Sequence, residues 1–170
     1  MYITPAQLAE RPGARELAQV ATRERDAIVV DDLMDATLRG TDRAAWTADQ
    51  VAIADDALAR INEAIDGAAG VIDGFLARRY PLPLAVVSPI VVEWSRSITR
   101  YLLHKDRISS DKDDPILRDY RDAQKMLQLT ADGKFSLGAD DPVLADTEAA
   151  DVQFTGDGRV FRRDPAGRYP

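Results

Sequence analysis

The chain has no cysteine and only one histidine, His104, among its 170 residues. The lack of cysteine excludes a disulfide scaffold, thiolate zinc sites and thiol catalysis. A single imidazole also argues against a histidine-rich metal site or a serine–histidine triad. We therefore expect no catalytic residue, no metal and no cofactor, and we interpret His104 as a favourable charge near the C-terminal end of a helix.

Long apolar runs are missing as well. No stretch approaches the roughly 20 apolar residues that span a bilayer, and residues 1–15 lack the basic and apolar regions of a signal peptide. The net charge of -7 argues against tight binding to nucleic acid phosphates. We expect no membrane partner, and we expect the protein to remain in the cytoplasm where it is made.

Three main amphipathic helices are predicted by apolar residues spaced three or four apart. The first begins at a capping box, Thr47 to Gln50. Its apolar stripe comprises Ala54, Leu58, Ile61, Ile65, Ala68, Ile72 and Phe75. Glycines at 67, 70 and 74 interrupt this stripe, so the helix either bends there or approaches a neighbour closely.

The other two main helices begin at a capping residue followed by proline, at Ser88 and at Asp114. The apolar face of the earlier one comprises Val91, Trp94, Ile98, Tyr101 and Leu102, opposite Arg96, Arg100 and Lys105. The apolar face of the helix after Asp114 comprises Ile116, Tyr120, Ala123 and Leu127, and we expect this helix to end at Gly133.

Shorter elements precede the first long helix. Thr4 and Pro5 start a helix that runs to about residue 11, Pro12 and Gly13 break it, and residues 14–22 form another. Residues 23–46 are ambiguous: 28–30 fit either a strand or the buried edge of a turn, and 31–38 fit one or two helical turns ended by Gly40.

A proline-spaced elbow, punctuated by Pro81, Pro83 and Pro89, follows Arg78, Arg79 and Tyr80 and joins the first two main helices. Residues before proline avoid the helical region, so Tyr80 and Leu82 should be extended. Arg78, Arg79 and Tyr80 are candidates for contact with a partner's carboxylates or phosphates. The equally weighted alternative is a basic helix end that satisfies its own dipole.

The C-terminal residues differ from the rest. Residues 139–151 are acidic and 159–168 are basic. The segments VQF and RVF flank an Asp-Gly turn, which predicts a β-hairpin. Because an isolated hairpin is marginally stable, we expect it to pair with another surface. The candidate partner contacts here are Val152, Phe154, Val160, Phe161, Arg162 and Arg163.

Acidic clusters elsewhere do not predict chemistry. Asp111, Asp113 and Asp114 lack the glycine and terminal glutamate of a calcium loop. Carboxylates of the first long helix have the spacing of its solvent side; they are Asp55, Asp56, Glu63, Asp66 and Asp73. We therefore predict a mainly α protein that is not an enzyme: a helical body at 1–138 and an extended tail with a hairpin at 139–170.

Four segments together resemble the Mu Gp36-like phage protein family: MYITPAQLAER, IDGFLARRYPLPL, ITRYLLHKDR and VQFTGDGRVFRRD. Residues 23–46 depart from the family pattern as a variable insertion. The resemblance implies a virion protein of the phage neck, a head–tail connector or adaptor. Such a protein forms a ring, dodecameric by resemblance, between the portal protein and the head-closure or tail-completion proteins. Double-stranded DNA would pass through its lumen without sequence-specific binding.

Two alternatives to the adaptor stay open. One is a head-closure or tail-completion protein one position further along the neck. The other is a regulatory or enzymatic helical domain in which carboxylates support metal-assisted chemistry. The second would need a concave acidic cluster, which the sequence does not display.

Overall fold

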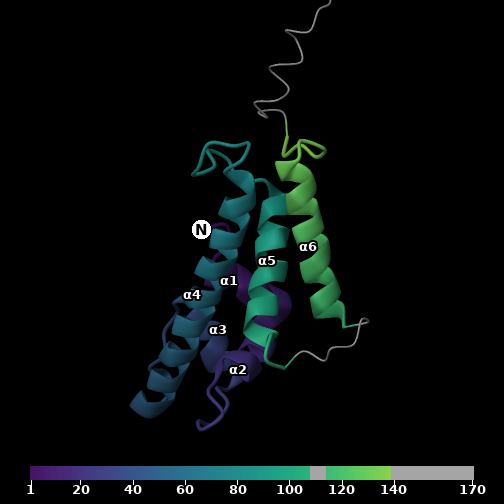
Figure 1. Ribbon diagram of the computed structural model, residues 1–170. Coiled ribbons are helices and arrows are strands. Elements are labelled where there is room, and N and C mark those ends of the chain that lie inside the picture. The colour runs from purple at the N-terminus through teal and green to yellow at the C-terminus, as the bar shows by residue number, and fades with distance from the viewer. Residues whose placement is uncertain (108–113, 139–170) are drawn as a thin grey trace, which may run out of the picture.

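A computed structural model of the chain describes residues 1–107 and 114–138 (Figure 1). These residues form α1 (Pro5–Leu8), a π-helical turn η1 (Ala9–Gly13), α2 (Ala14–Ala21), α3 (Asp31–Arg39), α4 (Ala48–Leu76), α5 (Pro89–His104) and α6 (Pro115–Ala131). They include no strand. The mainly α prediction is confirmed for this part of the chain, whereas the predicted hairpin lies outside it.

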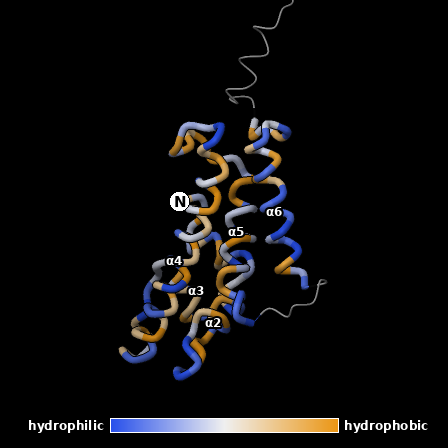
Figure 2. The backbone as a smooth tube through the Cα atoms, viewed as in Figure 1, coloured by the Kyte–Doolittle hydropathy of each residue, from blue (hydrophilic) through white to orange (hydrophobic). Residues whose placement is uncertain are grey.

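The long helices α4, α5 and α6 pack side by side, with α5 between the other two in Figure 1, and α4 also contacts α6. The short helices α1, α2 and α3 gather against α4. Figure 2 shows hydrophobic and hydrophilic residues alternating along the helices, as expected when each helix buries one face. The elbow lies at one end of the long helices, and the connection between α2 and α3 lies at the other.

Two hydrophobic cores lie along α4. Its N-terminal half buries Ile61 and Ile65 among residues of α1, α2 and α3. Its C-terminal half buries Ile72 and Leu76 against α5 and α6. Alanines fill the remaining contacts of α4 at Ala54, Ala57, Ala64, Ala68 and Ala69. The predicted stripe is therefore confirmed in its centre, but Leu76 is buried at its end while Phe75 is only partly buried.

The predicted helix starts are largely confirmed. The Thr47 side chain accepts a hydrogen bond from the Gln50 N–H, and the Gln50 side chain accepts one from the Thr47 N–H. Thr4 and Gln7 form the same box before α1, and Asp114 caps α6. The helix after Ser88 begins as predicted, but the Ser88 hydroxyl makes no capping hydrogen bond.

The ambiguous segment before α4 contains a helix rather than a strand. Helix α3 buries Leu33 and Met34 and ends at Gly40, whose φ of 66° lies in the left-handed region. Val29 is buried, whereas Ile28 and Val30 are 62% and 51% exposed. No strand forms at residues 28–30, and the buried-edge interpretation holds for Val29 alone.

The glycines of α4 differ in what surrounds them. A Cβ at Gly67 would lie 3.2 Å from Leu102 Cδ1 of α5, so this glycine permits close approach of the two helices. A Cβ at Gly70 or Gly74 would meet nothing within 4 Å. Of the three glycines in α4, Gly67 alone therefore permits a close contact with a neighbouring helix.

We predict that Gly70→Ala raises the free energy of unfolding by about 0.5–1 kcal/mol, because alanine loses less backbone entropy in a helix. Gly67→Ala is the matched control and should gain less or lose stability, since Leu102 must move. Urea denaturation of both variants measures the difference. Equal stabilisation at the two positions would contradict the close approach at Gly67.

Candidate protein–protein interface

The base of the elbow is fixed to the end of α6. Arg79 donates hydrogen bonds to the carbonyls of Thr130 and Phe135 at 3.2 and 3.1 Å. The Tyr80 hydroxyl accepts a hydrogen bond from the Leu137 N–H at 3.3 Å, and the Arg79 guanidinium lies 5.6 Å from the centre of the Tyr80 ring. The elbow and the residues after α6 therefore form one connected unit.

The three residues predicted to face a partner, Arg78, Arg79 and Tyr80, differ in their exposure and in their contacts within the chain. Tyr80 is only 8% exposed and belongs to the hydrophobic core, so its expected place on the surface is wrong. Arg79 is partly buried and has partners within the chain. Two of its hydrogen bonds go to the Thr130 carbonyl in the last turn of α6 and to the Phe135 carbonyl just after that helix. Arg78 is exposed, and its contact with a partner stays a prediction.

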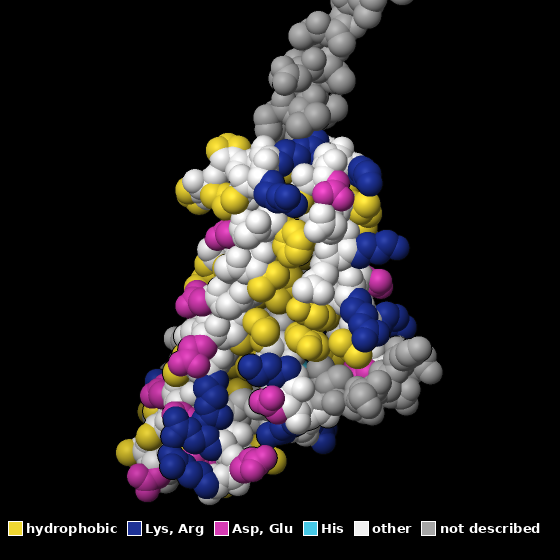
Figure 3. Space-filling model, in the orientation of Figure 1, with side chains coloured by type: hydrophobic (Ala, Val, Ile, Leu, Met, Phe, Trp, Pro, Cys, Tyr) yellow, Lys and Arg dark blue, Asp and Glu magenta, His cyan; other side chains and the backbone are white. Residues whose placement is uncertain are grey.

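The tip of the elbow is apolar and exposed. No charged residue occurs between Arg79 and Glu93. Leu82, Val86 and Val87 are 36%, 74% and 39% exposed, while Leu84 packs against the core. Figure 3 shows hydrophobic side chains at the upper left, where this loop lies in Figure 1. Exposed apolar groups gathered on a fixed base are typical of interaction sites.

A polar cluster joins α2 to α5. The Glu16 carboxylate accepts hydrogen bonds from Arg100 Nε at 2.5 Å and Nη2 at 2.8 Å, and His104 Nε2 lies 3.0 Å from it. Burial by itself would raise the pKa of Glu16, but the hydrogen bonds and charges of Arg100 and His104 outweigh it and lower that pKa. The hydrogen bond to Glu16 in turn raises the pKa of Arg100 despite its partial burial.

The prediction that Arg96, Arg100 and Lys105 form an exposed face of α5 is only partly right. The Arg100 side chain is 31% exposed and pairs with Glu16, and the Arg96 side chain is 15% exposed and pairs with Glu93. Only Lys105 of the three predicted residues is fully on the surface. His104 lies in the last turn of α5, as predicted, and additionally contacts Glu16.

The carboxylates of α4 are mostly engaged in structural contacts. Asp55 pairs with Arg43, Asp56 pairs with Arg23 and Arg60, and Asp73 accepts a hydrogen bond from the Tyr2 hydroxyl. Across residues 1–107 and 114–138, no three His, Asp or Glu side chains are placed to hold a metal ion. Asp111 and Asp113 lie outside these ranges.

One polar pocket, of about 240 Å³, lies beside the Glu16 cluster. Charged residues of both signs line this pocket: Arg11, Glu16, Glu93, Arg96, Arg100 and Asp119. The arrangement ties helices together and offers no nucleophile with an adjacent base. None of the described helices is long and apolar enough to cross a membrane.

A larger groove, of about 810 Å³, lies between the end of α2, the middle of α4 and the end of α5. Its apolar lining comprises Val20, Ala21, Ala64, Gly67, Leu102 and Leu103. Its charged lining comprises Arg23, Glu24, Arg25, Arg60, Glu63, Lys105, Asp106 and Arg107. Figure 3 shows Lys and Arg side chains gathered at this lower end of the molecule.

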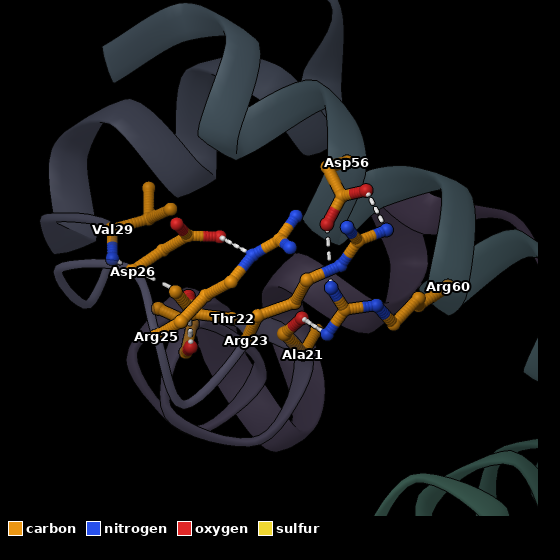
Figure 4. A network of polar contacts seen from close by, with 9 residues as sticks. Ala21, Thr22, Arg23, Arg25, Asp26, Val29, Asp56 and Arg60 are labelled. Atoms are coloured by element: carbon orange, nitrogen blue, oxygen red, sulfur yellow. Dashed lines mark hydrogen bonds and ion pairs between the residues drawn. The ribbon is translucent and has the colours of Figure 1, made fainter. Parts of the chain in front are cut away.

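Hydrogen bonds hold one wall of the groove in place (Figure 4). Arg60 donates to the Ala21 carbonyl at 2.6 Å, and Asp56 joins Arg60 to Arg23. The Thr22 hydroxyl donates to the Ala18 carbonyl at 2.6 Å and accepts from the Val29 N–H at 3.4 Å. Sequence reasoning missed this groove because its walls come from three distant segments.

The remaining predicted contacts lie in the tail, outside the described residues: Val152, Phe154, Val160, Phe161, Arg162 and Arg163. Their role stays a prediction. The described part thus defines a small helical protein with an exposed apolar elbow and a separate groove.

The chain belongs to the family described as Bacteriophage Mu, Gp36, whose model matches residues 2–155. It is 32% identical over 105 residues to the Mu-like prophage FluMu protein gp36 of Haemophilus influenzae, covering 62% of this chain and 70% of that one. It is 33% identical over 114 residues to gene product J of Escherichia phage Mu, covering 66% and 77% respectively. The resemblance inferred from the sequence is confirmed.

We predict that Glu16→Gln lowers the free energy of unfolding at pH 7 by about 1–2 kcal/mol, because Arg100 and His104 lose a charged acceptor. Folding lowers the pKa of Glu16, so this stabilisation is complete when the pH is above the pKa of Glu16 in the unfolded chain. It is lost as the pH falls through the lower pKa of Glu16 in the folded protein. The variant should therefore lose less stability than the original chain in acid. Glu24→Gln, at an exposed position without an ion pair in the described part, is the control. An unchanged acid dependence in Glu16→Gln would contradict the prediction.

Proposed function

We propose that this protein is a structural, non-catalytic head–tail connector of the phage neck, which assembles as a homo-oligomeric ring between the portal protein and the tail. The observation that carries the proposal is membership of the phage Mu Gp36 family across residues 2–155. The base of the elbow, where the segment IDGFLARRYPLPL of the family resemblance lies, is joined by hydrogen bonds to the end of α6 and to the residues after it.

A ring needs two different complementary patches on each subunit, because each copy meets the next head to tail. The described surface offers two separate candidates, an apolar elbow and a groove whose lining is partly apolar and partly charged. A compact helical body with buried cores along α4 supplies the fixed geometry that a closed ring demands.

Charge is consistent with DNA passing through the ring. The net charge of -7 and the exposed carboxylates of α4, such as Glu63 and Asp66, repel a phosphate backbone. In the proposed role, double-stranded DNA moves through the lumen without being held there.

The tail is the proposed contact to the adjacent neck or tail protein. Residues 152–163 carry two short apolar segments around an Asp-Gly turn, followed by Arg162 and Arg163. Such segments suit addition to the edge of a neighbour's sheet, where main-chain hydrogen bonds supply affinity. The arginines would then pair with acidic groups beside that edge.

We predict that deleting residues 150–170 leaves a soluble helical body but blocks head–tail joining, because the body buries its cores without these residues. Circular dichroism checks the body, and electron microscopy of lysates should show separate filled heads and tails. Deletion of residues 164–170 alone, which retains 152–163, is the matched control and should join normally. Normal infectious particles from the longer deletion would contradict the tail contact.

We also predict that the full chain, alone or with portal protein, forms rings in light scattering and electron microscopy. Labelling the chain in intact virions then fixes its layer. Density next to the portal supports the connector, whereas density one layer further away assigns it to head closure or tail completion. A chain that stays monomeric with portal and binds divalent metal tightly would overturn the structural role in favour of a metal-assisted one.

A further inference from the structure

We propose that residues 140–148, the acidic segment, cover the exposed apolar side chains of the elbow in the same copy of the chain. The segment has the sequence DDPVLADTE and lies just beyond the described residues. The inference does not rest on the connector role. It concerns what occupies the elbow in the free protein, and hence what a partner must displace in order to bind there.

The elbow exposes apolar surface on a fixed base. Leu82, Val86 and Val87 are 36%, 74% and 39% exposed. Arg79 and Tyr80 hold the base of the loop to the residues after α6. The prolines of the elbow restrict its backbone, so the loop loses little conformational entropy on docking. Because covering aliphatic side chains is favourable in proportion to the area removed from water, this tip favours an occupant with aliphatic side chains.

The chain leaves the described body beside this surface. The Leu137 N–H donates a hydrogen bond to the Tyr80 hydroxyl at 3.3 Å. Val86 follows Tyr80 by six positions, and Val143 follows Leu137 by six positions. Six extended residues span at most about 20 Å, so stretches of equal length join the two valines to one hydrogen-bonded point. The acidic segment can therefore reach the elbow without any rearrangement of the body.

Charge at this end of the molecule favours an acidic occupant. Arg78 and Lys134 are exposed, and neither forms an ion pair within the described residues. Both are next to Arg79 or to its contacts, because Arg79 donates to the carbonyl of Phe135, the residue after Lys134. Figure 3 shows Lys and Arg side chains at the upper end of the molecule, beside the hydrophobic elbow. Three cations against Asp132 leave a net positive charge around the base of the elbow.

The acidic segment has the matching composition. Its carboxylates are those of Asp140, Asp141, Asp146 and Glu148, and it contains no Lys or Arg. Val143 and Leu144 lie between the two pairs of carboxylates. Aliphatic side chains with carboxylates on either side are complementary to an apolar tip with cations at its base.

The other candidate occupants are less suited to the elbow. Residues 152–163 are also apolar in part, but they contain three arginines against one aspartate. That charge has the same sign as Arg78 and Lys134, so it opposes docking at the elbow. A separate protein or a second copy must compete with a tethered segment, whose effective concentration is on the order of millimolar. The free chain therefore favours its own acidic segment.

Disulfide trapping within one chain tests the contact, because the chain has no cysteine of its own. Val86→Cys and Leu144→Cys are introduced together in the full chain, at a dilution that suppresses links between chains. A disulfide requires Cα atoms within about 7 Å. Under mild oxidation, the intramolecular disulfide should form at least about tenfold faster than in the matched pair Gln128→Cys and Leu144→Cys.

Gln128 is the control position because it is exposed and also near the start of the tail. It lies in the last turn of α6, and the carbonyl of the adjacent Leu129 accepts hydrogen bonds from the Lys134 and Phe135 N–H groups. Circular dichroism melting of each variant verifies folding, and Val86 is exposed enough for its substitution to be tolerated.

Three outcomes overturn the contact. The first is equal rates of disulfide formation in the two pairs. The second is a predominance of links between chains at every dilution, which assigns the elbow to another copy. The third is faster closure of Val86→Cys with Phe154→Cys than with Leu144→Cys, which assigns the elbow to residues 152–163.

Charge reversal tests the electrostatic part of the contact in the same trapping assay. Arg78→Glu together with Lys134→Glu should slow the disulfide between positions 86 and 144 about fivefold, because two cations near the carboxylates are lost. Adding Asp141→Lys and Asp146→Lys should restore the rate.

Two exposed reversals on α6, Arg121→Glu with Lys125→Glu, form the matched control and should leave the rate unchanged. A rate that is insensitive to the reversal of Arg78 and Lys134, or that is not restored by the compensating lysines, contradicts the proposal. Location of the chain in virions does not enter this assay, so its result is independent of the test of the connector role.

Discussion

The two-sided burial of α4 is the constraint on which the rest of the structure depends. Ile61 and Ile65 hold the short N-terminal helices, and Ile72 and Leu76 hold α5 and α6. Each fully buried aliphatic side chain contributes about 1.5–3 kcal/mol of transfer free energy. Because one continuous helix serves both cores, the groove beside its middle and the elbow at its end have a fixed relative position.

Local signals explain why much of this fold could be predicted from sequence. The capping box at Thr47, the cap at Asp114 and the left-handed Gly40 act within a few residues of themselves. The apolar stripes of α4, α5 and α6 repeat with the helical period, so the centre of each buried face follows from the spacing, while residues toward the ends of the stripes are only partly buried. The family resemblance came from contiguous segments and was equally visible without a structure.

Contacts between distant residues explain the failures. The sequence analysis predicts that Tyr80 faces a partner, yet Tyr80 is buried and its hydrogen-bond partner Leu137 lies 57 positions away. Glu16 meets Arg100 across 84 positions, and no local pattern connects them. The groove likewise needs α2, α4 and α5 in place before it exists. Positions whose surroundings come from another segment cannot be assigned from helical periodicity.

The hydrogen bonds from Arg79 to Thr130 and Phe135, and from Leu137 to Tyr80, also have a mechanical meaning. They fasten residues 130–137 to the base of the loop between α4 and α5. Because Tyr80 belongs to the C-terminal core and Phe135 and Leu137 pack against it, tension applied at Gly138 would be borne jointly by this junction and that core. In an assembly pulled by its neighbours, the load on the tail and the position of the elbow would therefore be linked.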